Sequence, residues 1–121
     1  MFIGSPPLKL SAITNEDSDG NAMLKAHAYL AQSHGEVNSH VEYTGGNQNI
    51  SGFVGNTNDP AGAGTKINND GIPGASAENI RGGVSFDVAK GEYFEITTGS
   101  ASAATVLWRS FGPLKKPVDF N

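Results

Sequence analysis

A strict alternation of apolar and polar residues in the last third of the chain restricts the possible fold more than any other feature. Within residues 80–112, Val84, Phe86 and Val88 alternate with polar residues. A period of two places every second side chain on the same face, as in a half-buried β-strand. This stretch therefore predicts a strand with one face in a core.

Two further runs follow the first one. The turn Ala89-Lys90-Gly91 precedes an alternating run over residues 92–98, and Gly91 can adopt the positive φ that a bulged hairpin loop requires. A loop of small residues, 99–104, then leads to an apolar run over residues 105–111. We expect three strands, the first two joined as a hairpin.

Composition favours an all-β domain over a helical one. The 121 residues are enough for one domain with one core, and they include 16 Gly, 6 Pro and 37% hydrophobic residues. Gly and Asn are poor helix formers and are common in turns, so a helical bundle is disfavoured.

Charge and cysteine content exclude several classes of function. The net charge is −4 and the longest basic run is Lys115-Lys116, whereas nucleic-acid binding needs clustered Lys and Arg. No apolar run approaches the length of a membrane span, and no basic region followed by an apolar core begins the chain, so we expect a soluble, unprocessed protein without membrane insertion. The lack of Cys excludes disulfides, thiolate catalysis and Cys zinc sites.

The two ends are expected to be extended arms around a domain at residues 14–112. Pro6-Pro7 disfavours regular structure within residues 1–13, and two further Pro do so within residues 113–121. Each arm has apolar residues that can lie on its own domain or on a neighbouring subunit. The candidate attachment residues are Phe2, Ile3, Leu8, Leu10, Val118 and Phe120.

The first half predicts three more strands. Residues 23–31 are interpreted as a strand, although Ala, Met, Leu and Lys also favour helix there. The expected inward set in this run is Leu24, Ala26, Ala28 and Leu30. Residues 37–43 are predicted to form its hairpin partner, with one face formed by Val37, Ser39, Val41 and Tyr43. Residues 50–54 predict a short strand, and residues 55–79 an exposed loop with a possible short strand at 66–68.

Two groups of residues contain side chains of the kinds that bind metal ions. Residues 15–21 resemble a calcium loop in their alternating oxygen ligands and Gly20, but His27 stands near the position where a Glu ligand is needed. His27, His34 and His40 fall in one segment without a His-x-His pattern, and across the predicted hairpin at most two of them could join Glu36 or Glu42. We predict a plain acidic turn, solvent-facing histidines and no metal.

No stretch of the chain is a catalytic signature. The serines lack a Gly-x-Ser-x-Gly elbow, and neither Gly62-Ala63-Gly64 nor Gly82-Gly83 precedes a predicted helix that could bind phosphate. Asp87 and Glu95 lie on neighbouring predicted strands, where carboxylates are commonly solvated. A protein without catalytic residues or cofactors is expected.

The last predicted strand is apolar on both faces. Val106 and Trp108 share one face, and Leu107 and Phe111 share the other. Such a strand is either central in a two-layer sandwich or covered by another subunit on one side. In the second case Arg109 would lie beside an acidic group or a carbonyl of the partner.

The segment VSFDVAKGEYFEI, followed by the small-residue loop and ATVLWRSFG, resembles the final strands of C1q/TNF-like jelly rolls. The length, the lack of Cys and the Gly/Asn-rich middle are also similar to the small trimeric heads of bacteriophage fibres and tail needles. The resemblance implies a single antiparallel jelly-roll sandwich and a homotrimer around a three-fold axis. It implies a subunit interface with Tyr93, Val106, Trp108 and Arg109.

The same resemblance implies a virion protein that binds rather than catalyses. Its expected role is to decorate a phage capsid or shell, with other virion proteins as partners. The alternative is the receptor-binding head of a tail fibre or needle, in which residues 56–79 recognise a host surface receptor through Asn56, Asn58, Asp59, Asn68, Asn69 and Asp70. A metal-dependent β-barrel enzyme using His27, His40 and Glu42 is a third hypothesis.

Overall fold

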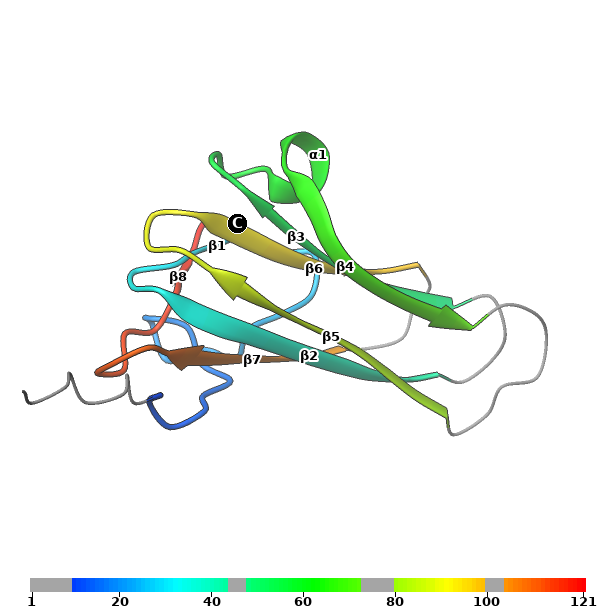
Figure 1. The fold of residues 1–121 in the computed structure, drawn as a ribbon, viewed down its shortest axis with the longest axis horizontal. Helices are drawn as coiled ribbons and strands as arrows, with labels where there is room; N and C mark the ends of the chain where they lie inside the picture. The colour runs from blue at the N-terminus through cyan, green and yellow to red at the C-terminus, as the bar shows by residue number, and fades with distance from the viewer. Residues whose placement is uncertain (1–9, 44–47, 73–79, 100–103) are drawn as a thin grey trace, which may run out of the picture.

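Two antiparallel β-sheets face each other in the computed structural model, which describes residues 10–43, 48–72, 80–99 and 104–121 (Figure 1). The first sheet has the strand order β4-β3-β6-β1-β8 and the second has the order β5-β2-β7. The elements are β1 (Tyr29–Leu30), β2 (Gly35–Tyr43), β3 (Gln48–Gly55), α1 (Pro60–Ala63), β4 (Thr65–Ile72), β5 (Ile80–Val88), β6 (Tyr93–Thr98), β7 (Ala104–Ser110) and β8 (Val118–Asp119). The predicted all-β class is confirmed, while jelly-roll connectivity stays a prediction.

Aromatic rings from both sheets form the centre of the core. Trp108 on β7 is fully buried and stacks on Phe94 of β6, with ring centroids 5.5 Å apart and planes 2° from parallel. Phe94 in turn stacks on Tyr29 of β1 at 5.6 Å. Burial of the Tyr29 ring raises the pKa of its hydroxyl to about 12. These stacked rings join the two layers of the sandwich.

The alternation in the sequence predicted the buried faces of the long strands correctly. Val84, Phe86 and Val88 point inward from β5, and Phe94 and Ile96 do so from β6. The predicted inward residues of β2 that can be compared, Val37, Ser39 and Val41, are also buried. Period-two burial is therefore the signal that located these strands.

The predicted hairpins are wrong, because neighbouring strands in the sequence pair with distant ones. Gly91 has the expected positive φ of 89°, but β5 pairs with β2, and β6 pairs with β3 and β1. The turn at residues 89–92 therefore crosses from one sheet to the other. Alternation shows which face of a strand is apolar, but it contains no information on which strand lies beside it.

The predicted strand over residues 23–31 is also wrong for most of its length. Only Tyr29 and Leu30 form β1, Leu24 is 52% exposed, and Met23 is buried instead. Ala26 has a φ of +63°, which interrupts any extended run and changes the side on which later side chains lie. The Leu24 amide donates to the Tyr29 hydroxyl at 2.6 Å, so the segment bends around the Tyr29 ring.

The segment at residues 55–79, expected to be an exposed loop with a short strand at 66–68, contains α1 and the eight-residue strand β4, which includes residues 66–68. Asp59 caps α1 by accepting a hydrogen bond from the Gly62 amide. β4 pairs with β3 along its length, yet residues 65–71 are all exposed. An exposed strand needs no apolar alternation, so its sequence looked like a loop.

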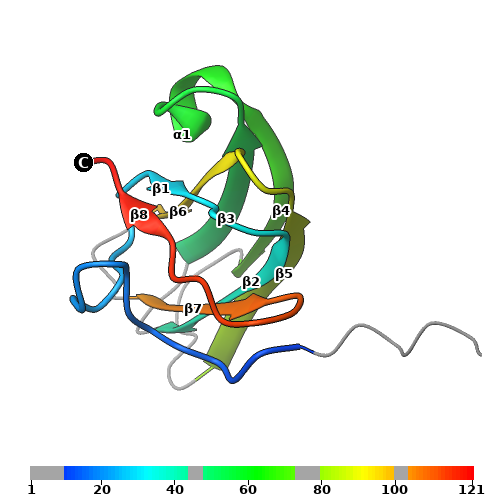
Figure 2. The same cartoon turned by 90° about the vertical axis from the view of Figure 1, so that its left-hand side faces the viewer.

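The described parts of both predicted arms lie on their own domain (Figure 2). Thr14 exchanges two backbone hydrogen bonds with Trp108, and Leu10 forms a bridge with Phe111, so this segment follows the free edge of β7. At the other end, β8 pairs with β1, and the Phe120 ring contacts Tyr93 edge-on at 5.4 Å. Phe2, Ile3 and Leu8 lie outside the described residues.

Side chains of β4 form hydrogen bonds to β5 of the other sheet, at a place where no backbone ladder joins the two sheets. The Asn68 amide donates to the Ser85 carbonyl at 3.2 Å, and the Gly83 amide donates to Asp70 Oδ2 at 3.1 Å. These bonds satisfy backbone groups at the outer edge of β5, the kind of edge that otherwise invites pairing with another chain.

Gly52 on β3 is expected to be intolerant of a side chain. A Cβ at this position would overlap the ring of Phe86 on the facing sheet. Overpacking a core costs about 1–3 kcal/mol, so Gly52→Ala should lower the free energy of unfolding by that amount in urea denaturation. In the double variant Gly52→Ala/Phe86→Leu the loss should be smaller than the sum of the two single losses. Strict additivity would contradict contact between these positions.

Candidate interaction face

The solvent side of the three-stranded sheet carries a mixed polar and apolar surface, here called the outer face. It is formed by residues that alternate with the buried ones on β2, β5 and β7. These are Glu36, Asn38 and His40 of β2, Ser85 and Asp87 of β5, and Thr105, Leu107 and Arg109 of β7. Their register places them in cross-strand rows.

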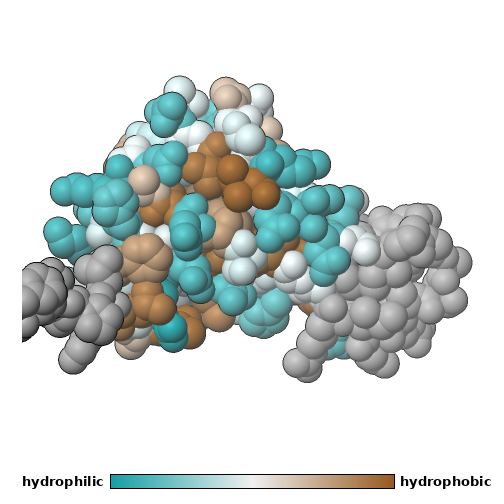
Figure 3. Space-filling view, viewed as in Figure 1, coloured by the Kyte–Doolittle hydropathy of each residue, from teal (hydrophilic) through white to brown (hydrophobic). Residues whose placement is uncertain are grey.

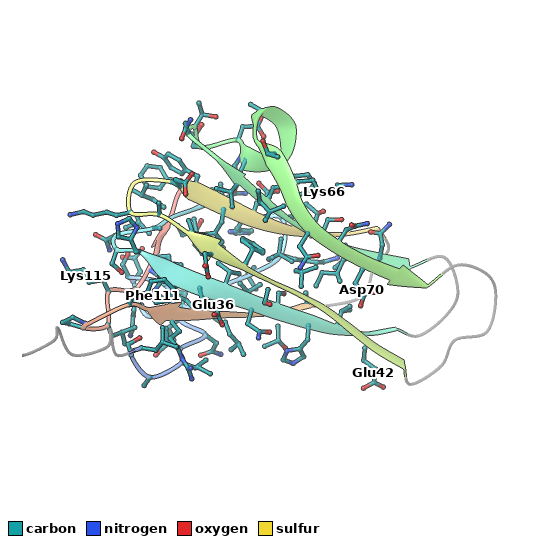
Figure 4. All side chains as sticks on the ribbon, viewed as in Figure 1. Glu36, Glu42, Lys66, Asp70, Phe111 and Lys115 are labelled. Atoms are coloured by element: carbon teal, nitrogen blue, oxygen red, sulfur yellow. The ribbon has the colours of Figure 1, made fainter. Side chains whose placement is uncertain are left out.

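One row of the outer face contains three charged residues. Glu36 is paired in register with Asp87 on one side and with Arg109 on the other. Figure 4 shows Glu36 at the end of the sheet where Phe111 lies, and Glu42 at the opposite end. Two carboxylates side by side repel each other, and like charges in directly opposite positions are unfavourable on a sheet.

Arg109 borders a hollow of about 200 Å³, here called the Arg109 hollow. The side chains of Ile13 and Leu107 supply apolar surface there, and Glu36 and Asn38 supply polar surface. The Nε atom of Arg109 is buried and has no hydrogen-bond partner, and Arg109 forms no ion pair with any described residue. A buried guanidinium nitrogen without an acceptor is costly, and such groups in folded proteins usually have a partner.

A second hollow of about 470 Å³, here called the His34 hollow, lies beside the C-terminal ends of β5 and β7. It is lined by His34, Asp87, Val88, Ala89, Glu92 and Phe111. Three chain segments therefore meet around it: the loop before β2, the turn between β5 and β6, and the residue after β7.

Apolar side chains are exposed beside this end of the outer face. Ile13 is 53% and Leu10 is 42% exposed, and both belong to the segment along β7. Figure 3 shows hydrophobic residues gathered on this end of the molecule, next to the start of the described chain. Exposed apolar surface beside polar groups is typical of protein interaction sites.

The structure places the predicted interface residues in different environments. Val106 and Trp108 are 1% and 0% exposed inside a single chain, so neither side chain has surface to offer a second subunit. The expectation that these two residues form the contact is therefore corrected: they are core residues of the sandwich. Tyr93 is half-buried against Phe120 on the other sheet, and Arg109 lies on the outer face.

The predicted ligand-binding residues fall into two separate groups. Asn56, Asn58 and Asp59 are exposed between β3 and α1, and Asn56 borders a hollow of about 490 Å³ with Thr57, Thr65 and Ile67. Asn68, Asn69 and Asp70 lie on β4, where Asn68 and Asp70 bind the backbone of β5. Ligand recognition by these residues stays a prediction.

The three histidines do not come together. His27 Nδ1 lies 3.1 Å from Asp119 Oδ2 on β8, His34 Nδ1 accepts from the Lys90 amide, and His40 is on the outer face. The idea that His27 faces His40 across a hairpin is wrong, because β1 and β2 belong to different sheets. Within the described ranges, no group of three or more His, Asp or Glu side chains could hold a metal ion.

The calcium-like turn uses its central carboxylate for its own backbone. Asp17 is 2% exposed, and its Oδ1 accepts hydrogen bonds from the Asp19 and Asn21 amides at 2.9 and 3.1 Å. Such a bond pattern is typical of an Asx turn. Asp17 therefore has a local structural role.

Sequence reasoning missed Glu36, Asn38 and Ile13 as parts of a surface site. The alternation of β2 does predict that Glu36 and Asn38 point away from the core. The sequence did not show that β2 pairs with β7, and this pairing places Glu36 and Asn38 beside Arg109. Non-local pairing assembled this site.

None of the helical structure in the described part of the chain is long and apolar enough to cross a membrane. Comparisons with protein-family models, with curated proteins and with solved structures found no match to this chain. The likeness to C1q/TNF-like jelly rolls therefore rests on the residues quoted for it and stays a prediction.

The pKa of Glu95 on β6 is raised above its ordinary value of 4.5 by partial burial and by repulsion from Asp59, with an opposing contribution from His27. A raised carboxyl pKa means that the folded chain binds more protons than the unfolded chain above pH 4.5. Stability contributed by the protonated form is therefore lost as pH rises through the folded pKa.

Glu95→Gln should consequently raise the melting temperature at pH 7, and the gain should disappear as the pH falls below about 4.5. Thermal melts at several pH values test this. Glu42→Gln, an exposed carboxylate near the end of β2 on the opposite sheet, serves as the matched carboxylate control. An equal gain at all pH values would contradict an electrostatic origin.

Proposed function

We propose that this chain is a non-enzymatic structural or binding protein that works as a homo-oligomer, with the outer face as a contact surface. The observation that carries the proposal is the half-buried Arg109, which lies beside Ile13 and Leu107 and forms no ion pair with any described residue. A guanidinium on a partly apolar surface is a common anchor of protein interfaces. An acceptor oxygen on a neighbouring chain would bind the exposed part of this guanidinium.

The proposed contact uses side chains other than those predicted from the sequence. With Val106 and Trp108 in the core, the apolar part of the contact falls to Leu107 of β7 and to Ile13 and Leu10 beside it. Arg109 supplies the polar part, and Glu36 supplies an acceptor for a second copy. A surface that carries both donor and acceptors can complement another copy of itself.

The biological setting of the proposal comes from the resemblance. A homotrimer is the oligomer that C1q/TNF-like jelly rolls suggest, and decoration of a phage capsid or shell is the corresponding role in a virion. The segment of residues 10–14 supports attachment of this kind, because its apolar side chains Leu10 and Ile13 remain exposed although its backbone pairs with β7.

Light scattering coupled to size exclusion should give a mass of three times the 12.6 kDa chain. Arg109→Ala should raise the dissociation constant of the oligomer about thirty-fold or more, because truncating a charged interface anchor commonly costs about 2 kcal/mol or more. Circular dichroism should show that the variant keeps the fold, since the Arg109 side chain lies outside the core.

Lys66→Ala is the matched control. Lys66 lies on β4 of the other sheet, 5.7 Å from the centre of the Phe53 ring, and Figure 4 shows it away from Glu36. A mass of one chain at every concentration would overturn the oligomer. Equal effects of the Lys66 and Arg109 substitutions would overturn the outer face as the contact.

A further inference from the structure

The His34 hollow is held in shape by hydrogen bonds from all three segments that line it. The Phe111 amide donates to the His34 carbonyl at 2.9 Å, and the Lys90 amide donates to His34 Nδ1 at 3.2 Å. The turn is closed by the Glu92 amide, which donates to the Ala89 carbonyl, and by the Ala89 amide, which donates to Glu92 Oε1. A pre-formed hollow loses little entropy when a ligand enters.

The lining combines apolar surface with negative charge. Ala89 and the Phe111 ring supply the apolar part, and the carboxylates of Asp87 and Glu92 supply the charge. His34 keeps its proton on Nε2 while Nδ1 accepts from Lys90, so in this state the imidazole adds no positive charge.

These carboxylates have no cationic partner within the described part of the chain. Neither Asp87 nor Glu92 forms an ion pair, and the nearby lysines Lys90 and Lys115 are exposed and make none with them. Asp87 also lies opposite Glu36 on β2, so two like charges share one row. A cation placed in the hollow would relieve this repulsion.

We propose that the His34 hollow binds an alkylammonium group on an apolar stem, as presented by a lysine side chain of a partner protein. The methylene stem lies against Ala89 and the edge of the Phe111 ring, and the ammonium donates to Asp87 and to the free oxygen of Glu92. The Phe111 ring adds a cation–π contact. The volume of about 470 Å³ is within the usual range for ligand sites.

The hollow that holds this site is separate from the Arg109 hollow, because the two share no lining residue. A titration followed by NMR tests it with the full chain. The probe is Nα-acetyl-lysine N-methylamide, and the matched control is Nα-acetyl-norleucine N-methylamide, which has the same stem without the ammonium.

The lysine probe should shift the amide signals of Lys90 and Phe111 saturably at low millimolar concentrations, and the norleucine probe should bind at least about five-fold more weakly. Asp87→Asn should weaken lysine binding about three- to ten-fold. Glu42→Gln removes the same charge at the opposite end of β2 and should leave binding unchanged (Figure 4).

Three results would overturn the proposal. Equal binding of the two probes would make the hollow a purely apolar one. Equal weakening by the Asp87 and Glu42 substitutions would replace a specific site by general attraction to a chain of net charge −4. Tighter binding of spermidine than of the lysine probe would assign the hollow to a free polyamine instead of a protein side chain.

Discussion

The packing of Trp108 between the two sheets is the interaction on which the rest of the structure depends. Its ring stacks on Phe94 of the facing sheet, and a Cβ at Gly35 would overlap it, so the indole lies directly against the backbone of β2. Its Nε1 donates to Ser110 Oγ at 3.0 Å and to the Lys115 carbonyl at 2.9 Å. One side chain therefore joins both layers and the segment that leads to β8.

The outer face follows from the orientation of Trp108. Because side chains alternate along a strand, burial of Trp108 and Val106 sends Leu107 and Arg109 to the other side of β7. β2 lies between β7 and β5, so it places Glu36 next to Arg109 and Asp87. The core and the proposed contact surface are therefore the two faces of the same three-stranded sheet.

Both edges of the three-stranded sheet are covered by parts of the same chain, which favours interaction through faces and hollows. Residues 10–14 cover the free edge of β7, and Asn68 and Asp70 bind the outer edge of β5. Covered edges reduce uncontrolled pairing of strands between molecules. An assembly of copies would then use side chains such as Arg109, which allow a defined geometry.

The sequence by itself determined the all-β class and the inward residues of β2, β5 and β6, because burial of alternate residues is a local property of each strand. Only the tertiary structure decided which strands pair, and with that the Asp87, Glu36 and Arg109 row. Pairing depends on contacts between residues far apart in the sequence, which no local pattern contains. The full length of exposed β4 and the bend at Ala26 were missed for a related reason: neighbouring strands and the Tyr29 hydroxyl position these segments, and the local sequence pattern does not show those contacts.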